Sequence, residues 1–460
     1  MTGSWANALW ETAPRAHIDA VTSARAVQLI ADAYQRVPFY RWFYDRAGLR
    51  PAGLRTLADV KREVPFVTKA DLLEFQDTTE WEALDQTQVR QFHLTSGTSG
   101  AGRELHLRDQ KDLAAFGTGG AYSLLWAGLR PGDRLLLTIP YSQTMAGPYF
   151  QAACEAAGVV PVNGFALDSN GRIDALGTYR CAAISLTPSH LHRLTVLTQQ
   201  RGIEPVRDLP ALRSIILSGE SYGLQWAERM QAWWGVRVHE GWGATQTMGV
   251  AMATCSLGAI VEEPAGPRRG TLHGLDHRCL IEVLGADDRP VDAGQCGEVV
   301  VTTLRVSAMP CIRFRMGDQV YRHPRERCDC GRQFTTYVAG SLSRIDDMMK
   351  VRGMNIWPTA VDSVVFGVTS VTDYRGRLFT DDDGREQMLL EIEAATDGSA
   401  SERLEHLLAA RVKSVVGITP LVRLLPPGEI GEPMLNTAAS FKSRRWADQR
   451  LARINGGADE

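Results

Sequence analysis

Short apolar runs alternate with amphipathic stretches through the first half of the chain. Apolar residues recur at helical spacing over residues 18–50, and further helices are expected near 57–62 and from Lys69 onward. From residue 110, helix-length segments separate short apolar runs of the kind found in buried parallel strands. The expected helices are 110–127, 146–157, 189–201 and 223–234, and the expected strands are 135–139, 159–162, 182–186, 214–217 and 236–239. This alternation predicts an α/β fold in which helices flank a parallel sheet.

The pattern changes after about residue 270. Short strands separated by turns are expected at 279–284, 297–304, 310–315 and 319–322. Beyond a boundary near 341–347, a compact α+β pattern follows, with helices at 358–366 and 401–416 and strands at 371–379, 387–395 and 421–425. We therefore expect an N-terminal core over 1–343, with a β-rich subdomain at about 270–340, and a small C-terminal α+β domain over 344–460.

Composition narrows the class of protein. The length of 460 residues suits two or three domains, and 44% hydrophobic with 22% charged residues is ordinary for a globular protein. A net charge of −3 gives no electrostatic basis for binding nucleic acid or an anionic membrane. Residues 1–17 lack the basic start and apolar centre of a signal peptide, and no apolar run approaches the length of a membrane span. The expectation is a cytoplasmic protein with neither nucleic acid nor membrane as partner.

The most informative segment is LTSGTSGAGR, residues 94–103, between two short expected strands. Glycines let backbone N–H groups converge and hydroxyls add donors, a combination that suits a polyphosphate. The spacing of Gly97 and Gly102 is that of a P-loop, but Arg103 and Glu104 stand where a P-loop needs Lys and Ser or Thr, and Glu104 would repel phosphate. A flexible linker is the alternative. The expected phosphate contacts are Ser96, Gly97, Thr98, Ser99, Gly100 and Arg103.

Polar and aromatic residues follow several of the expected strands. Trp242 to Gln246 come after the strand at 236–239, where an aromatic ring can stack on a base and Thr245 can donate to a phosphate. Ser218 to Glu220 and Thr187 to His190 follow two other strands. Ligands of parallel sheets bind at the carboxyl ends of the strands, so a nucleotide site is expected at this edge. Ordinary turns and helix caps are the alternative for each segment.

Together these segments resemble the adenylate-forming superfamily, which includes acyl-CoA synthetases, adenylation enzymes and luciferases. The glycine loop is similar to T-S-G-T-T-G-x-P, residues 242–246 to Y-G-x-T-E, and 312–318 to I-R-Y-R-T-G-D. Residues 343–358 are similar to G-R-x-D-D-M-x-K-x-R-G-x-N-x-x-P, with Ser343 in place of the first glycine. Two further segments, 37–40 and 64–72, resemble phenylacetate–CoA ligases, a branch of this superfamily.

The resemblance assigns roles to individual residues. Lys442, in a segment similar to G-K-x-x-R-V-x-D, is the implied catalytic lysine, and Thr245 contacts the α-phosphate. Gln246 stands where the family has the glutamate that helps to hold magnesium, and its uncharged amide should bind the metal less well. Asp346 is the implied hinge. The implied nucleotide contacts are Gly219, Glu220, Glu240, Trp242, Gly243, Ala244, Asp318 and Arg344, and the implied acyl pocket is Tyr141, Met145, Gly147, Pro188 and His190.

The cysteines suggest one metal site. Cys328 and Cys330 lie one residue apart beside a glycine, which looks like half of a metal site. The phenylacetate–CoA ligase branch often carries a structural zinc, and the resemblance implies Cys255 and His273 as the other ligands, with His277 as a competing one. Unbound thiols are the alternative. The remaining cysteines are expected to be small core residues: Cys154, Cys181, Cys279, Cys296 and Cys311.

The resemblance implies an AMP-forming ligase. It would use ATP and magnesium to convert a carboxylic acid, expected to be aromatic, into an acyl-adenylate, and would then transfer the acyl group to a thiol, with coenzyme A as the first expectation. One alternative is a stand-alone adenylation enzyme of natural-product biosynthesis that passes a hydroxy- or aminobenzoate-type acid to the phosphopantetheine of an acyl carrier protein or to an amine. Another is a catalytically degenerate nucleotide-binding relative, suggested by Gln246. A homodimer is the candidate assembly.

Overall fold

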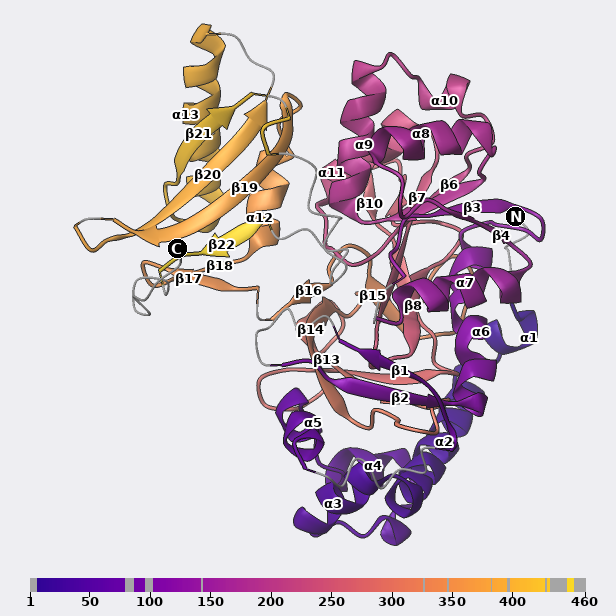
Figure 1. The fold of residues 1–460 in the computed structure, drawn as a ribbon. Helices are drawn as coiled ribbons and strands as arrows, with labels where there is room; N and C mark the ends of the chain where they lie inside the picture. Colours follow the sequence, from indigo (N-terminus) through magenta and orange to yellow (C-terminus); the bar gives the residue numbers. More distant parts are fainter. Residues whose placement is uncertain are drawn as a thin grey trace.

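The structure is a computed structural model of the chain (Figure 1). It describes residues 6–78, 87–95, 102–141, 144–325, 327–345, 347–381, 383–394, 398–426, 428–430 and 445–450. Within these ranges no helix is both long enough and apolar enough to cross a bilayer.

An eight-stranded sheet forms the centre of the N-terminal part, in the order β15-β11-β8-β7-β6-β5-β3-β4. Its parallel half confirms the predicted α/β fold and consists of β4 (Val160–Asn163), β3 (Arg134–Leu137), β5 (Ala183–Leu186), β6 (Ser214–Leu217) and β7 (Arg237–Ala244). Antiparallel strands extend the sheet beyond β7, namely β8 (Gly249–Thr254), β11 (Thr271–Gly274) and β15 (Thr336–Val338).

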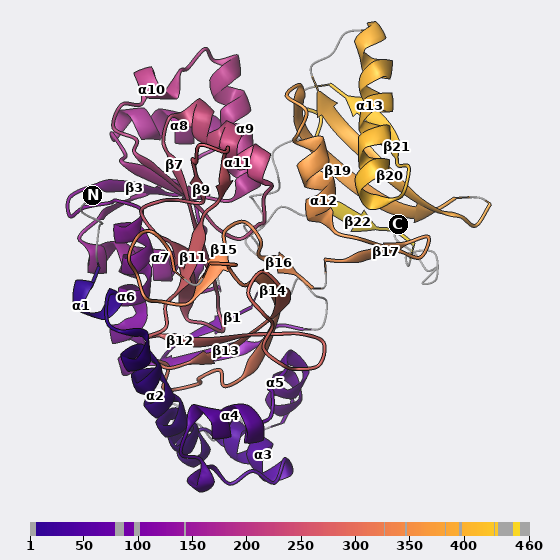
Figure 2. The ribbon, with the colours of Figure 1, turned by 180° about the vertical axis from the view of Figure 1, so that it is seen from behind.

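Helices cover both faces of the parallel half because successive side chains of each strand point to opposite faces. On β3, Leu135 and Leu137 pack with the helices of one face, whereas Leu136 belongs to the cluster on the other face. The first face carries α6 (Gln110–Trp126) and α7 (Ala146–Ala157). The second face carries α8 (Ser169–Thr178), α9 (Pro188–Gln200), α10 (Pro205–Asp208) and α11 (Leu224–Trp234) (Figures 1 and 2).

The N-terminal segment is broken into more helices than its periodicity predicts. Most of the residues expected to be helical over 18–50 are helical, but they form two helices, α2 (Arg15–Arg36) and α3 (Pro38–Arg46). Val37 between them is extended, with φ −107° and ψ 111°, as expected for a residue that precedes proline. The other elements of this region are α1 (Ala8–Glu11), the 3-10 turn η1 (Pro51–Gly53), α4 (Leu57–Glu63) and α5 (Lys69–Gln76).

Outside the central sheet, the chain forms a hairpin-like pair of strands, a four-stranded sheet and two small ladders. Strands β1 (Val89–Leu94) and β2 (Leu105–Asp109) pair antiparallel on either side of the glycine loop. The separate strands expected at 310–315 and 319–322 are wrong, because Arg313 has a left-handed φ of 46° and one continuous strand starts after it. The four-stranded sheet is β12 (Cys279–Leu284), β13 (Cys296–Thr303), β14 (Phe314–Tyr321) and β16 (Ser343–Arg344). Two small ladders are β9 (Ile260–Val261) with β10 (Arg268–Arg269) and β17 (Met349–Val351) with β18 (Met354–Ile356).

The C-terminal part builds its own sheet, in the order β21-β20-β19-β22, with two helices packed together beside it (Figure 2). Buried apolar residues of both helices, including Val361, Leu408 and Val412, belong to the core of this part. The elements are α12 (Pro358–Val365), β19 (Val371–Thr380), β20 (Glu386–Ala394), α13 (Gly398–Val416), β21 (Leu421–Leu425) and β22 (Trp446–Asp448).

The two parts meet where α9 and α11 face α12 and β19 (Figure 1). His192 of α9 lies at this contact, with its ring centroid 4.8 Å from that of Phe366. Trp226 Nε1 of α11 donates to its Nδ1 at 3.3 Å. Burial lowers the pKa of His192 to about 4, despite the opposing effect of Asp373, so the imidazole is neutral at neutral pH.

The buried imidazole makes stability depend on pH. The pKa of His192 is about 4 in the folded chain and 6.5 in the unfolded chain, so the unfolded chain takes up this proton first as the pH falls. The contribution of the neutral imidazole to the free energy of unfolding is complete above pH 6.5 and is lost as the pH falls towards 4. At pH 5 the loss is about 2 kcal/mol. Urea unfolding at pH 7 and pH 5 should show a smaller pH-dependent loss for His192→Gln than for the wild type. An equal loss in both proteins would contradict this assignment.

Candidate active site

The parallel strands end at one edge of the sheet, where the loops after β5 and β6 are joined through a carboxylate. Glu220 accepts hydrogen bonds from the backbone N of Ser189 at 3.0 Å and from its hydroxyl at 2.6 Å. Thr187 accepts from the N–H of His190 and caps α9. Hydrogen bonds therefore hold the strand ends and the start of α9 together at this edge, where ligands of parallel sheets bind.

The residues expected in the acyl pocket follow β3 and β5, which are neighbouring parallel strands. Tyr141 and Met145 lie between β3 and α7, and Pro188 and His190 open α9. Gly147 has no room for a side chain, since a Cβ there would stand 2.7 Å from the carbonyl oxygen of Pro140. The topology thus places all five predicted residues at the same edge of the sheet.

His190 is already engaged inside the protein. It is 2% exposed, and Arg172 Nη1 donates to its Nε2 at 2.6 Å. The Arg172 guanidinium also donates to the carbonyl oxygens of Gly164 and Phe165, both at 2.9 Å. Burial, followed by the nearby arginine, lowers the pKa of His190 to about 3, so a neutral imidazole faces a cation. Sequence reasoning did not find Arg172.

The Trp242–Gln246 segment runs from the end of β7 into the turn before β8. Gly243 passes so close to β8 that a Cβ would lie 2.1 Å from the carbonyl oxygen of Gly249. The fully buried Arg108 of β2 holds this turn, donating from Nη2 to the carbonyl oxygen of Thr245 at 2.8 Å. The strand that follows the glycine loop therefore holds the turn that carries Thr245 and Gln246.

Glu104 is a buried carboxylate beside this turn to which sequence reasoning assigned no role in the site. Its carboxylate is buried, and its Oε2 accepts from Gln246 Nε2 at 2.7 Å and lies 3.0 Å from His106 Nε2. Lys69 Nζ lies 3.9 Å from its Oε1. The signal was available, because the two-residue period of β2 places Glu104, His106 and Arg108 on one face.

The base of the glycine loop is closed by Thr95 and Glu104. The backbone N of Thr95 donates to the carbonyl oxygen of Glu104 at 3.0 Å, and the backbone N of Glu104 donates to Thr95 Oγ1 at 2.9 Å. Arg103 Nε donates to the carbonyl oxygen of Thr95 at 2.9 Å. The predicted phosphate contacts Ser96 to Gly100 lie outside the described residues.

Asp318 and Arg344 lie opposite each other on β14 and β16. Arg344 Nη1 is 3.3 Å from Asp318 Oδ2 and donates to the carbonyl oxygen of Met316 at 3.0 Å. The structure thus brings together the two residues predicted to contact the nucleotide sugar and phosphates. Asp346, the predicted hinge, and Lys442, the predicted catalytic lysine, lie outside the described residues.

Glu240 is buried inside the sheet. Its Oε2 accepts from the hydroxyl of Tyr222 and from the backbone N of Gly340, both at 2.6 Å. Burial raises the pKa of the Glu240 carboxyl, and these two donors oppose the rise. Glu240 thereby joins β7 to the segment that leads into the C-terminal part.

Cys255, His273, Cys328 and Cys330 converge on one point, with all their ligand atoms within 4.8 Å of one another. Hydrogen bonds from Cys255 and Cys330 lower the pKa of the Cys328 thiol. The competing candidate His277 lies elsewhere, with its ring centroid 4.6 Å from that of Tyr122. Three thiols and one imidazole form a closed donor set that fits tetrahedral zinc.

Comparisons with known proteins agree with this geometry. The model of the AMP-binding enzyme family matches residues 16–309, and that of the AMP-binding enzyme C-terminal domain matches 353–450. The chain belongs to the AMP-binding enzymes. Within this adenylate-forming superfamily it falls in the phenylacetate–CoA ligase branch: the phenylacetate–coenzyme A ligase of Thermus thermophilus is 31% identical over 439 residues, 91% of this chain and 95% of the relative. As a member of this branch, the chain is an AMP-forming acid–thiol ligase.

Solved structures of this superfamily share the fold. A 2-hydroxyisobutyryl-CoA ligase in its postadenylation state has a TM-score of 0.83 at 24% identity, covering 97% of this chain and 92% of that chain. The same ligase in its thioesterification state has a TM-score of 0.67, covering 97% of this chain and 93% of that chain.

Proposed function

We propose that this protein activates an aryl carboxylic acid with ATP and transfers the acyl group to coenzyme A. The observation that carries the proposal is the contact between the base of the glycine loop and the turn that holds Thr245 and Gln246. Glu104 at the loop base accepts from Gln246 at 2.7 Å, and Arg108 of the following strand donates to the carbonyl oxygen of Thr245 at 2.8 Å. A phosphate-binding loop and a phosphate-contacting threonine are needed at the same place for adenylation. Relatives named phenylacetate–coenzyme A ligase support an aryl acid and coenzyme A as substrates.

The reaction has two steps. In the first, a carboxylate oxygen of the acid attacks the α-phosphorus of ATP, the bond to the β-phosphate oxygen breaks, and pyrophosphate leaves. In the second, the thiol loses its proton and its sulfur attacks the acyl carbon, AMP leaves, and a thioester forms. Magnesium, when bound near Gln246, offsets phosphate charge. Thr245 and the 96–100 loop bind the phosphates, Asp318 holds the ribose, and Lys442 stabilises the negative charge that develops in the first step.

The acyl group lies at the ends of β3 and β5. Met145 and Pro188 are buried there, and Tyr141 is 47% exposed, so apolar and aromatic surface faces an incoming ring. The C-terminal part pivots at Asp346 between the two steps, which brings the thiol to the acyl carbon.

The first test is the exchange of pyrophosphate into ATP in the presence of magnesium and a panel of aryl acids. The wild type should catalyse exchange with at least one aryl acid, and Lys442→Ala should reduce the rate by about 10²–10³-fold, because one stabilising charge is lost. Lys413→Ala removes an exposed lysine of α13 and is the matched control. Exchange by neither protein with any acid would contradict adenylation, and full activity of Lys442→Ala would exclude its assigned role.

The second test concerns the acceptor. The protein is incubated with ATP, the best acid of the exchange panel, and either coenzyme A or a phosphopantetheinylated carrier protein, and the products are identified by mass spectrometry. Acyl-CoA is expected at the faster rate. Acylation of the carrier protein alone would contradict coenzyme A as the acceptor while leaving adenylation intact.

We also propose that Cys255, His273, Cys328 and Cys330 hold a structural zinc. The four residues come from the end of β8, from β11 and from the loop before β15, so one ion would join three segments that are distant in sequence. A closed set of four protein ligands leaves no open position for chemistry, which favours a structural role.

Metal analysis of the purified protein tests the zinc proposal. About one zinc per chain is expected, and Cys330→Ser should lose it and unfold at a lower temperature, because the metal stabilises only the folded state. Cys296→Ser changes a half-buried cysteine outside the cluster and should keep the metal. A wild type without zinc, or a Cys330→Ser variant that retains it, would contradict the proposal.

A further inference from the structure

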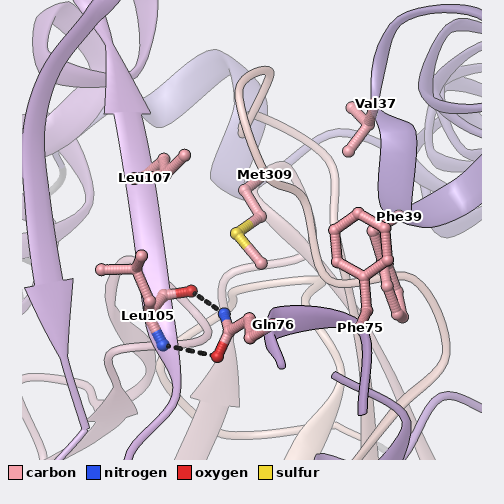
Figure 3. Close-up of a pocket in the computed structure, with 7 residues that line it drawn as sticks. All are labelled: Val37, Phe39, Phe75, Gln76, Leu105, Leu107 and Met309. Carbon is pink, nitrogen blue, oxygen red and sulfur yellow. Dashed lines mark hydrogen bonds between the residues drawn. The ribbon is translucent and has the colours of Figure 1, made fainter. Parts of the chain in front are cut away.

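Strand β2 separates an apolar face from a charged one. Leu105 and Leu107 line an apolar pocket together with Phe75 and Met309 (Figure 3). Glu104, His106 and Arg108 alternate with these leucines and lie on the opposite face, where all three are at most 2% exposed. Burying three ionisable groups on one face of a short strand costs desolvation free energy unless each group has a partner there.

The charged face meets the turn that carries Gln246. Arg108 donates to the carbonyl oxygen of Thr245, and the Gln246 amide donates to Glu104 Oε2 at 2.7 Å. A carboxylate only accepts hydrogen bonds, so the amide nitrogen faces Glu104 and the Gln246 carbonyl oxygen faces away from it. The pair therefore presents a negative carboxylate and a neutral carbonyl oxygen side by side.

Position 246 is where the superfamily motif resembled by this chain has a glutamate that helps to hold magnesium. Gln246 lacks that charge, whereas Glu104 carries a carboxylate to within hydrogen-bonding distance of the same side chain. We propose that Glu104 supplies the carboxylate for the divalent cation of ATP that position 246 lacks. This inference rests on the proposed adenylating function.

The surroundings of Glu104 suit this role. Its backbone closes the base of the phosphate loop through Thr95, so its side chain starts where the ATP phosphates are proposed to bind. Its Oε1 forms a long ion pair with Lys69 Nζ at 3.9 Å, and a divalent cation at this oxygen would take the place of that lysine. Magnesium is commonly held by one or two carboxylates together with substrate phosphates and waters, so a single carboxylate meets its needs.

A purely structural role is the competing explanation, because Glu104 also joins His106 to the 245–246 turn. The two roles differ in what they do to metal binding. A structural glutamate influences ATP and AMP binding alike, whereas a metal-facing carboxylate influences only the binding that needs a divalent cation.

The experiment measures Mn²⁺ binding to the protein with ATP by electron paramagnetic resonance, and metal-free AMP binding by calorimetry. Glu104→Gln should weaken Mn²⁺ binding about tenfold or more and leave AMP binding within about twofold. Glu74→Gln removes a charge from the exposed Arg46–Glu74 ion pair and should change neither value. Equal Mn²⁺ binding by Glu104→Gln and the wild type would overturn the proposal, as would a parallel loss of AMP binding.

Moving the charge provides a second readout. Glu104→Gln combined with Gln246→Glu keeps one carboxylate in the pair and should restore Mn²⁺ binding to within about threefold of the wild type. Gln246→Glu alone retains Glu104 and should tighten Mn²⁺ binding by placing two carboxylates together, so the proposal stays testable even if Glu104→Gln does not fold. No gain in Gln246→Glu and no restoration in the double variant would overturn it. A wild type without Mn²⁺-dependent ATP binding would instead refute the proposed function itself.

Discussion

A carboxylate buried on the inner face of a strand must be paired, and the pairing of Glu104 organises the centre of this enzyme. Its backbone closes the glycine loop with Thr95, and its side chain reaches Gln246 on the turn after β7. Lys69 of α5 approaches from a third direction. Three regions distant in sequence are thus held at fixed separations by one residue, and the same point is where loop, turn and metal are proposed to meet around ATP.

Other elements of the fold place further residues of the candidate site around Glu104. The parallel half of the sheet lines up the ends of β3, β5 and β6, and Glu220 fixes the loops after β5 and β6 through Ser189. Asp318 and Arg344 approach from a second sheet, just before the C-terminal part begins. The C-terminal part packs on α9 and α11, and His192 of α9 lies at the contact.

Local patterns predicted most of the fold but not its interruptions or its charged contacts. The buried strands and helices from residue 110 onward followed from apolar periodicity, whereas the break at Val37 required the backbone restriction that Pro38 imposes. The motifs predicted that Asp318 and Arg344 share one site, and the two residues do lie side by side because their strands pair directly. Glu104 and Arg172 were missed because the importance of a buried charge depends on partners far away in sequence, here Gln246 and His190. The sequence also left His277 open as a zinc ligand. In the structure its ring packs against Tyr122, and it is not one of the four residues that converge.

The most direct measurement is a crystal structure of the protein with Mn²⁺ and a non-hydrolysable ATP analogue, with the metal located by its anomalous signal. The anomalous signal is expected beside the nucleotide phosphates, with the Glu104 carboxylate as the protein ligand that would hold the ion. A manganese ion held by the phosphates and Gln246 with Glu104 still bound to the amide, or a nucleotide bound away from the Thr95–Glu104 loop base, would contradict this expectation.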